Sequence, residues 1–228
     1  MKIQTIDTLT LGQFWQGVIP SKATSVQGTM DGACGPYALF NALVLGGHVS
    51  FAKLVKLWNK KPDGRSLLGK WQSDCGPLLL HGTDKDVLDG LLDALNPHLK
   101  GKSSLKLKEI ISPTKGKPAL SESVNDETLQ TIQKFLAKEN QPLLVGLAGR
   151  HINHWTVAVG FQTHSREDSD VLSRILLIDP SEPIPQLHAW NATLSLGCQR
   201  NLGLRYLSFS DPDEQKCGVD GAWSLEKL

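Results

Sequence analysis

The chain has 228 residues, of which 40% are hydrophobic and 21% are charged, and these proportions are ordinary for a globular domain. Its 24 basic and 23 acidic residues leave a formal net charge of +1, which argues against nucleic acid or an anionic membrane surface as a partner. Four cysteines do not make a disulfide scaffold, so each is expected to be a core residue, a metal ligand or a nucleophile.

The first 140 residues predict helices. Residues 36–45 are apolar nearly all round, which is typical of a buried helix. Residues 51–58 and 84–95 carry apolar side chains at the spacing of an amphipathic helix. Residues 100–125 are rich in Lys, Ser and Pro, which predicts an exposed loop. The length favours a single domain over residues 1–228, with 100–125 as a mobile insertion.

The remainder of the chain predicts strands after one more helix, which is expected to be capped by Asn125 or Asp126. Short apolar or alternating stretches rich in β-branched residues cover 142–148, 155–161, 171–178 and 202–209. Helices followed by strands are typical of an α+β fold with a mostly antiparallel sheet.

The segment 32–36 reads GACGP and stands directly before the predicted buried helix. Proline suits the first turn of a helix, where its missing N–H is not needed, so Cys34 is expected at or just before the helix start. The positive end of the helix dipole stabilises a thiolate there, and the flanking glycines permit close approach of a substrate backbone. Cys34 is therefore a candidate nucleophile. A small buried cysteine in a tight turn is the structural alternative.

A thiolate nucleophile needs a general base and a group that orients the base. His154 stands at the mouth of the predicted strand 155–161, and Asp179 directly follows the predicted strand 171–178. If these strands form an antiparallel hairpin, the start of the first lies beside the end of the second. Asp179 is then expected to hold one ring nitrogen of His154 while the other nitrogen faces Cys34. The three residues predict a Cys-His-Asp triad.

The order Cys-Gly-Pro before a buried helix, His-Trp before a strand and Asp-Pro after the next strand resembles the papain-like cysteine hydrolases. Within them, residues 27–180 are most similar in outline to the double-glycine (bacteriocin-leader) peptidase-like group. The resemblance implies a papain-like α+β fold, in which an N-terminal buried helix carries the nucleophile and packs on a mostly antiparallel sheet. It also implies an oxyanion hole made by Gln27 and the backbone N–H of Cys34.

Two residues stay open as alternatives to members of the triad. The segment 73–77 repeats the Cys-Gly-Pro signature at Cys75, but the apolar run behind it is too short for a long central helix. His151 stands three residues before His154 and becomes the candidate base if the strand boundary shifts by a few residues.

The triad predicts a cysteine hydrolase that cleaves an amide, peptide or isopeptide bond through a thioester acyl-enzyme. The same chemistry also serves a glutamine deamidase or a transglutaminase-type effector or toxin, because the fold hosts several acyl transfers. A non-catalytic binding protein is the alternative from a different class. The presence of all three residue types in the expected order favours the enzyme.

No cofactor and no metal are expected, because the chain has no Cys-x-x-Cys or His-x-x-x-His spacing. The expected partner is a protein or peptide substrate, and an activating or inhibiting protein also stays open. Neither nucleic-acid binding nor membrane insertion is expected. No apolar run has the length of a membrane span or of a signal-peptide core. The protein is therefore expected in the cytoplasm, or exported by a dedicated secretion system without a cleavable signal peptide.

Overall fold

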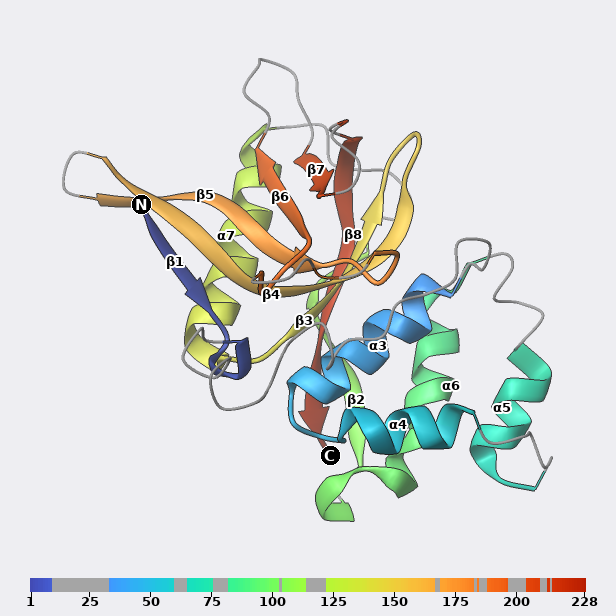
Figure 1. The fold of residues 1–228 in the computed structure, drawn as a ribbon. Helices are drawn as coiled ribbons and strands as arrows, with labels where there is room; N and C mark the ends of the chain where they lie inside the picture. Colours follow the sequence, from blue (N-terminus) through green and yellow to red (C-terminus); the bar gives the residue numbers. More distant parts are fainter. Residues whose placement is uncertain are drawn as a thin grey trace.

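The computed structural model describes residues 1–9, 33–59, 65–75, 82–102, 104–113, 122–166, 169–182, 184, 188–196, 204–209, 213 and 215–228. These residues form eight strands and five α-helices (Figure 1). The helices are α3 (Cys34–Leu45), α4 (Phe51–Trp58), α5 (Leu67–Cys75), α6 (Lys85–Leu95) and α7 (Glu122–Glu139), with the 3-10 turns η1 (Asp7–Leu9), η3 (Asn96–His98) and η4 (Lys100–Lys102). The strands are β1 (Lys2–Thr5), β2 (Leu105–Ile111), β3 (Leu143–Ala148), β4 (Asn153–Arg166), β5 (Ser169–Ile178), β6 (Ala192–Leu196), β7 (Leu204–Ser208) and β8 (Gln215–Lys227).

Six of the strands close into an antiparallel barrel. Their order is β4, β3, β8, β7, β6 and β5, and β5 pairs back with β4. The two remaining strands extend the sheet along the two longest strands. β1 pairs with β4 beyond the end of β3, with Lys2 opposite Thr163, and β2 pairs with β8 beyond the end of β7, with Leu105 opposite Lys227.

Local irregularities accompany the closure. The pairing of β4 with β5 shifts register between Ala158 and Gly160 and again between Gln162 and Thr163. Such bulges bend and twist a strand, which a closed barrel requires. In β8, Gly221 has a φ of 146°, and a Cβ added there would lie 2.3 Å from the Trp223 ring. Glycine at 221 therefore lets the strand bend while the indole of Trp223 packs directly over its backbone.

The barrel overturns the predicted fold class. A papain-like α+β architecture, with the nucleophile helix packed on a mostly antiparallel sheet, is wrong, because the strands form a closed six-stranded antiparallel barrel. The prediction failed because it recognised only the strands near 142–148, 155–161, 171–178 and 202–209. It missed β6 and β8, which connect β5 through β7 to β3. The glycines of β8 hide it from a reading based on β-propensity.

The helices gather in two places (Figure 1). Helix α3 packs on β4 and β3, and α6 packs on α3, α5 and β2, while α7 packs on β4, β5 and β6. Nearly every side chain of α3 is buried, as its uniformly apolar sequence predicts. Side-chain caps fix two of the helix starts, since Ser50 accepts a hydrogen bond from the Lys53 amide and Asp84 from the Val87 amide.

The elements expected near 36–45, 51–58 and 84–95 are confirmed as α3, α4 and α6, and the later helix, α7, begins earlier than expected, at Glu122. The loop expected over 100–125 is wrong over Leu105–Ile111, which forms β2. There Leu105 and Leu107 are buried, while Lys106 and Lys108 reach Glu226 on β8. The lysines that suggested a loop are the outward face of an alternating strand.

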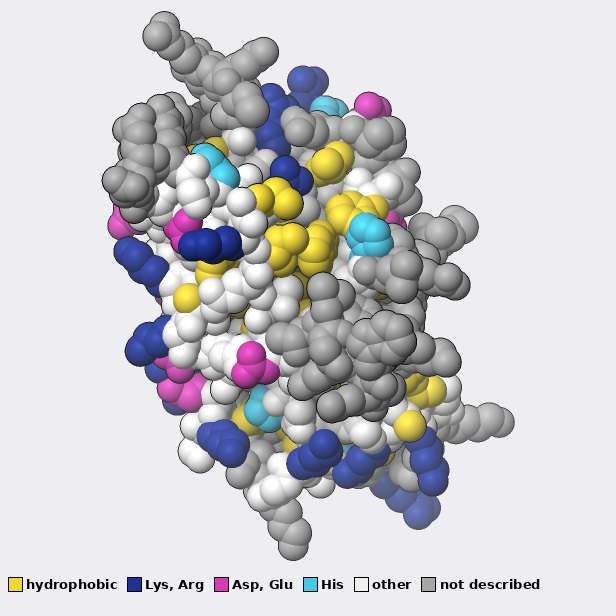
Figure 2. Space-filling view, turned by 60° about the vertical axis from the view of Figure 1, so that its left-hand side comes forward, with side chains coloured by type: hydrophobic (Ala, Val, Ile, Leu, Met, Phe, Trp, Pro, Cys, Tyr) yellow, Lys and Arg dark blue, Asp and Glu magenta, His cyan; other side chains and the backbone are white. Residues whose placement is uncertain are grey.

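Figure 2 shows basic side chains along the lower edge of the face that it draws, and acidic side chains scattered over the same face. None of the helices in the described ranges is both long and apolar enough to cross a membrane.

Candidate active site

Cys34 is the first residue of α3, as the Gly-Pro pair behind it predicts. Its side chain is buried, with 6% of its surface exposed. The first amides of a helix have no acceptor within the helix, and together with the aligned peptide dipoles they place partial positive charge at this end. Cys34 therefore stands at the electropositive end of α3.

His154 and Asp179 lie side by side on the barrel. The antiparallel pairing of β4 with β5 sets Val157 opposite Ile178, so the start of β4 meets the residue that follows β5. The expected hairpin is confirmed. His154 Nε2 lies 2.7 Å from Asp179 Oδ1, and the Asp179 residue is 2% exposed.

His154 also interacts with Cys34, which acts to raise the pKa of the imidazole. Since Asp179 occupies Nε2, this leaves Nδ1 for the thiol sulfur. Burial acts to lower the pKa of His154, but the hydrogen bond to Asp179 and the interaction with Cys34 outweigh it and raise the pKa to about 10. At neutral pH His154 is therefore an imidazolium whose Nε2 donates to Asp179.

Asp179 is held by a polar network that the sequence did not indicate. Its Oδ1 accepts a hydrogen bond from the Ser181 amide at 2.7 Å and another from the Ser181 hydroxyl. Its Oδ2 accepts one from the Tyr206 hydroxyl. Burial acts to raise the pKa of Asp179, but its hydrogen bonds with His154, Ser181 and Tyr206 outweigh burial and keep the pKa below its ordinary value.

Asn191, at the start of the segment that leads into β6, fixes the backbone of the same turn. Its Oδ1 accepts a hydrogen bond from the Asp179 amide at 2.6 Å, and its Nδ2 donates to the carbonyls of Asp179 and Glu182, both at 2.8 Å. Asn191 is fully buried. Sequence reasoning missed Asn191 and Tyr206 because they stand 12 and 27 residues from Asp179, and only the folded sheet brings them to its carboxylate and backbone. A buried Tyr in the predicted strand 202–209 was the only available signal.

Trp155 and Thr83 join the helical part of the site to the barrel. The Trp155 Nε1 donates to the Thr83 carbonyl at 2.7 Å. Thr83 in turn lies against the start of α3, because a Cβ added to Gly35 would stand 1.9 Å from its Oγ1. Trp155, which follows His154, is thus linked through Thr83 to Gly35, which follows Cys34.

Two pockets flank His154. The larger has a volume of about 560 Å³, and its lining includes Asn153, His154, Trp155 and Trp223. The ring centroids of the two indoles lie 5.0 Å apart. The smaller, of about 270 Å³, lies on the Asp179 side and includes Tyr206 in its lining. His154 lines both pockets, whereas Asp179 and its partners line only the smaller one.

The structure thus brings together Cys34, His154 and Asp179. His151, the alternative base, is exposed in the bend between β3 and β4. Cys75 ends α5, and its side chain lies outside the described residues, as does all of Gln27. Within the described ranges, no group of three His, Cys, Asp or Glu side chains is arranged to hold a metal ion.

Comparison with known proteins gives no family for the chain. No protein-family model matches it, and no curated protein matches it significantly.

Proposed function

We propose that the protein is a cysteine hydrolase that cleaves an amide, peptide or isopeptide bond, with Cys34 as nucleophile, His154 as acid–base and Asp179 as the group that orients His154. One observation carries the proposal: His154 is hydrogen-bonded to Asp179 and interacts with Cys34, which stands at the N-terminus of α3. The proposal depends on this arrangement of side chains and not on a papain-like fold.

In the first half-reaction the Cys34 sulfur attacks the carbonyl carbon of the substrate and forms a tetrahedral intermediate. The backbone N–H of Cys34 donates to the oxyanion, and Gln27 is the proposed second donor. His154 then gives its proton to the leaving nitrogen, the C–N bond breaks, and a thioester remains on Cys34. Asp179 stays ionised throughout and stabilises the imidazolium.

In the second half-reaction a water molecule attacks the thioester carbon while His154 accepts one of its protons. The C–S bond breaks, the carboxylic acid leaves, and the thiolate–imidazolium pair is restored. An amine in place of water would give transfer instead of hydrolysis, so access to the thioester decides the product.

The larger of the two pockets lined by His154 is the proposed substrate site, since it has the greater volume. The indoles of Trp155 and Trp223 form its apolar wall. Its lining also carries the acidic residues Asp84, Asp86 and Asp220, and its two cationic residues, Lys85 and His154, are paired with Asp89 and Asp179. The indole rings and the acidic residues together favour a substrate with a basic side chain next to the scissile bond.

The test is alkylation of the folded protein with limiting iodoacetamide at pH 6, followed by intact mass spectrometry and peptide mapping. An ordinary thiol, with a pKa of about 8.5, reacts slowly at this pH, whereas a thiolate paired with His154 reacts fast. We expect modification at Cys34 alone. Cys217 serves as an internal control, because burial raises its pKa to about 12.

Two variants make this test specific. His154→Ala should abolish the selective labelling, whereas His164→Ala, an exposed histidine on the same strand, should leave it unchanged. Labelling at Cys75 would move the nucleophile, and equal labelling in both variants would remove His154 from the mechanism. If Cys34 labels selectively, turnover of fluorogenic peptide amides should be lost in Cys34→Ala and fall at least about a thousandfold in Asp179→Asn.

A further inference from the structure

We infer that Tyr206 is a positioning residue for the proposed hydrolysis: its hydroxyl holds the carboxylate of Asp179 oriented toward His154. The inference rests on the proposed function. Tyr206 is not a catalytic residue, because its only described polar contact at the site is with Asp179.

The geometry gives Tyr206 and His154 one oxygen each of the same carboxylate. Tyr206 donates to Oδ2, and His154 Nε2 lies 2.7 Å from Oδ1. With Ser181 also on Oδ1, both oxygens are bound, so the carboxylate cannot rotate without breaking a buried hydrogen bond. The orientation of the carboxylate then fixes the plane of the imidazole.

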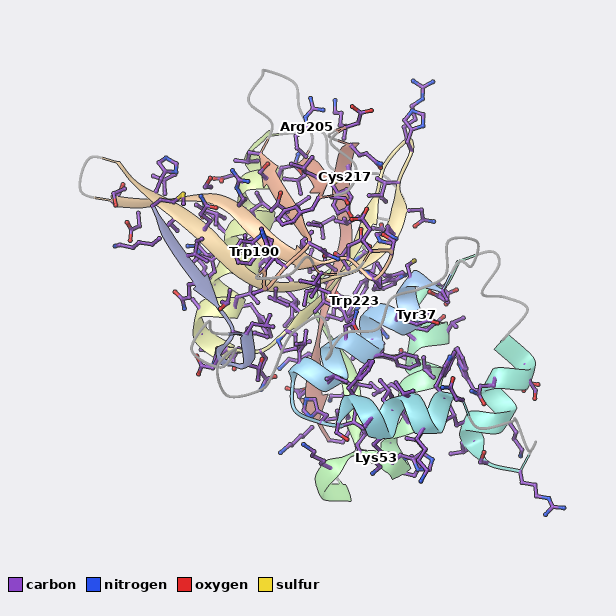
Figure 3. The ribbon with its side chains drawn as sticks, viewed as in Figure 1. Tyr37, Lys53, Trp190, Arg205, Cys217 and Trp223 are labelled. Carbon is purple, nitrogen blue, oxygen red and sulfur yellow. The ribbon has the colours of Figure 1, made fainter. Side chains whose placement is uncertain are left out.

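Tyr206 is itself rigidly placed. It lies on β7 opposite Leu194 of β6, and it is 4% exposed. Arg205, which is labelled in Figure 3, precedes Tyr206 on β7, and Gln215 stands opposite Tyr206 on β8. Strand β7 of the barrel therefore carries the hydroxyl that orients Asp179.

The surroundings keep Tyr206 a donor. The charged or titratable groups facing it are Asp179 from the end of β5, Glu182 from the following turn, and Cys217 from β8. Burial and the negative charge of Asp179 raise the pKa of Tyr206 well above its ordinary value, so the hydroxyl keeps its proton whenever Asp179 is ionised. Loss of this donor leaves Oδ2 buried without a partner and raises the pKa of Asp179.

The experiment measures the rate of iodoacetamide reaction at Cys34 from pH 3.5 to 8 in the wild type, Tyr206→Phe and Ser208→Ala. Phenylalanine keeps the ring and removes only the hydroxyl. Ser208→Ala is the matched control, because Ser208 lies on the same strand and donates to Glu182. Urea unfolding of each variant reports whether it is folded in the range used.

We expect the acid limb of the Tyr206→Phe profile to move up by roughly one pH unit. Ionised Asp179 stabilises the imidazolium beside Cys34, and a hydrogen bond to a buried charge is worth about that much. On that limb the rate at a fixed pH falls about tenfold, and Ser208→Ala follows the wild type. An unchanged limb in Tyr206→Phe, even with reduced stability, overturns the inference. A wild type that does not label at Cys34 instead overturns the proposed function, and the two failures are thus distinguished.

Discussion

The barrel and the helical region hold their parts of the site in different ways. His154 and Asp179 lie on neighbouring segments of the barrel, joined by a buried network of hydrogen bonds from Ser181, Asn191 and Tyr206. Cys34 belongs to a helix that packs on the barrel almost entirely through apolar side chains. A change in the first region therefore acts through charge and hydrogen bonding, and a change in the second acts through shape.

The largest expected effect lies in the barrel network. Asp179→Ala should lower the free energy of unfolding by about 3 kcal/mol, because it removes one member of a buried ion pair and leaves the Tyr206 hydroxyl without its acceptor. Urea unfolding at pH 6 measures this. Asp170→Ala is the control, since Asp170 stands near the other end of β5 in an exposed ion pair with Lys2 and should change stability little. Equal losses in the two variants would contradict the role of the network.

The helical region should respond to added volume. Gly35→Ala places a Cβ against Thr83 and should cost about 1–3 kcal/mol of stability, because the Thr83 segment must move. Gly90→Ala in α6 meets only Trp71 at 3.5 Å and should stabilise the protein by about 0.5–1 kcal/mol. Thermal unfolding compares the two. The same sign for both substitutions would show that the contact between Thr83 and α3 is loose.

The barrel pair should also give stability a pH dependence. The pKa of His154 is about 10 in the folded protein and ordinarily 6.5, so its contribution is complete below pH 6.5 and is lost as the pH rises toward 10. The difference in urea stability between the wild type and His154→Gln should therefore shrink steadily across this interval. A difference that stays constant from pH 6 to 10 would mean that His154 keeps no extra proton in the fold.

The smallest expected effect is on substrate choice. Asp86 is exposed at the pocket beside His154, so Asp86→Lys should leave stability and the reactivity of Cys34 nearly unchanged. It should raise KM for basic peptide amides several-fold, because it replaces an attractive charge at the edge of the pocket with a repulsive one. KM for neutral peptide amides should not change. Steady-state kinetics with paired substrates test this, and an equal change for both substrates would exclude a charge-selective pocket.

The local parts of the site were predictable because each depends on short-range chemistry. The Gly-Pro pair behind Cys34 places it at a helix start, and the paired strands around His154 and Asp179 place these residues side by side. The contact of Trp155 with Thr83 was not predictable, since it joins residues 72 positions apart along the chain.

The closed barrel was not predictable for a related reason. Its closure depends on β6 and β8, of which the first is five residues long and the second contains two glycines within its sequence. Neither has a strong pattern of its own, and their pairing partners stabilise them as strands. The lysines of β2 led to the prediction of a loop for a similar reason. Lys106 and Lys108 pair with Glu226 of β8, and this contact exists only once β2 and β8 are paired.

The sequence by itself determined the candidate nucleophile, base and orienting carboxylate, because helix starts and strand ends are set by neighbouring residues. Only the tertiary structure decided that the sheet closes into a barrel, and that Tyr206 and Asn191 surround Asp179. The physical reason is that a buried carboxylate must satisfy both of its oxygens, and the groups that do so come from whichever strands the closed sheet brings next to it.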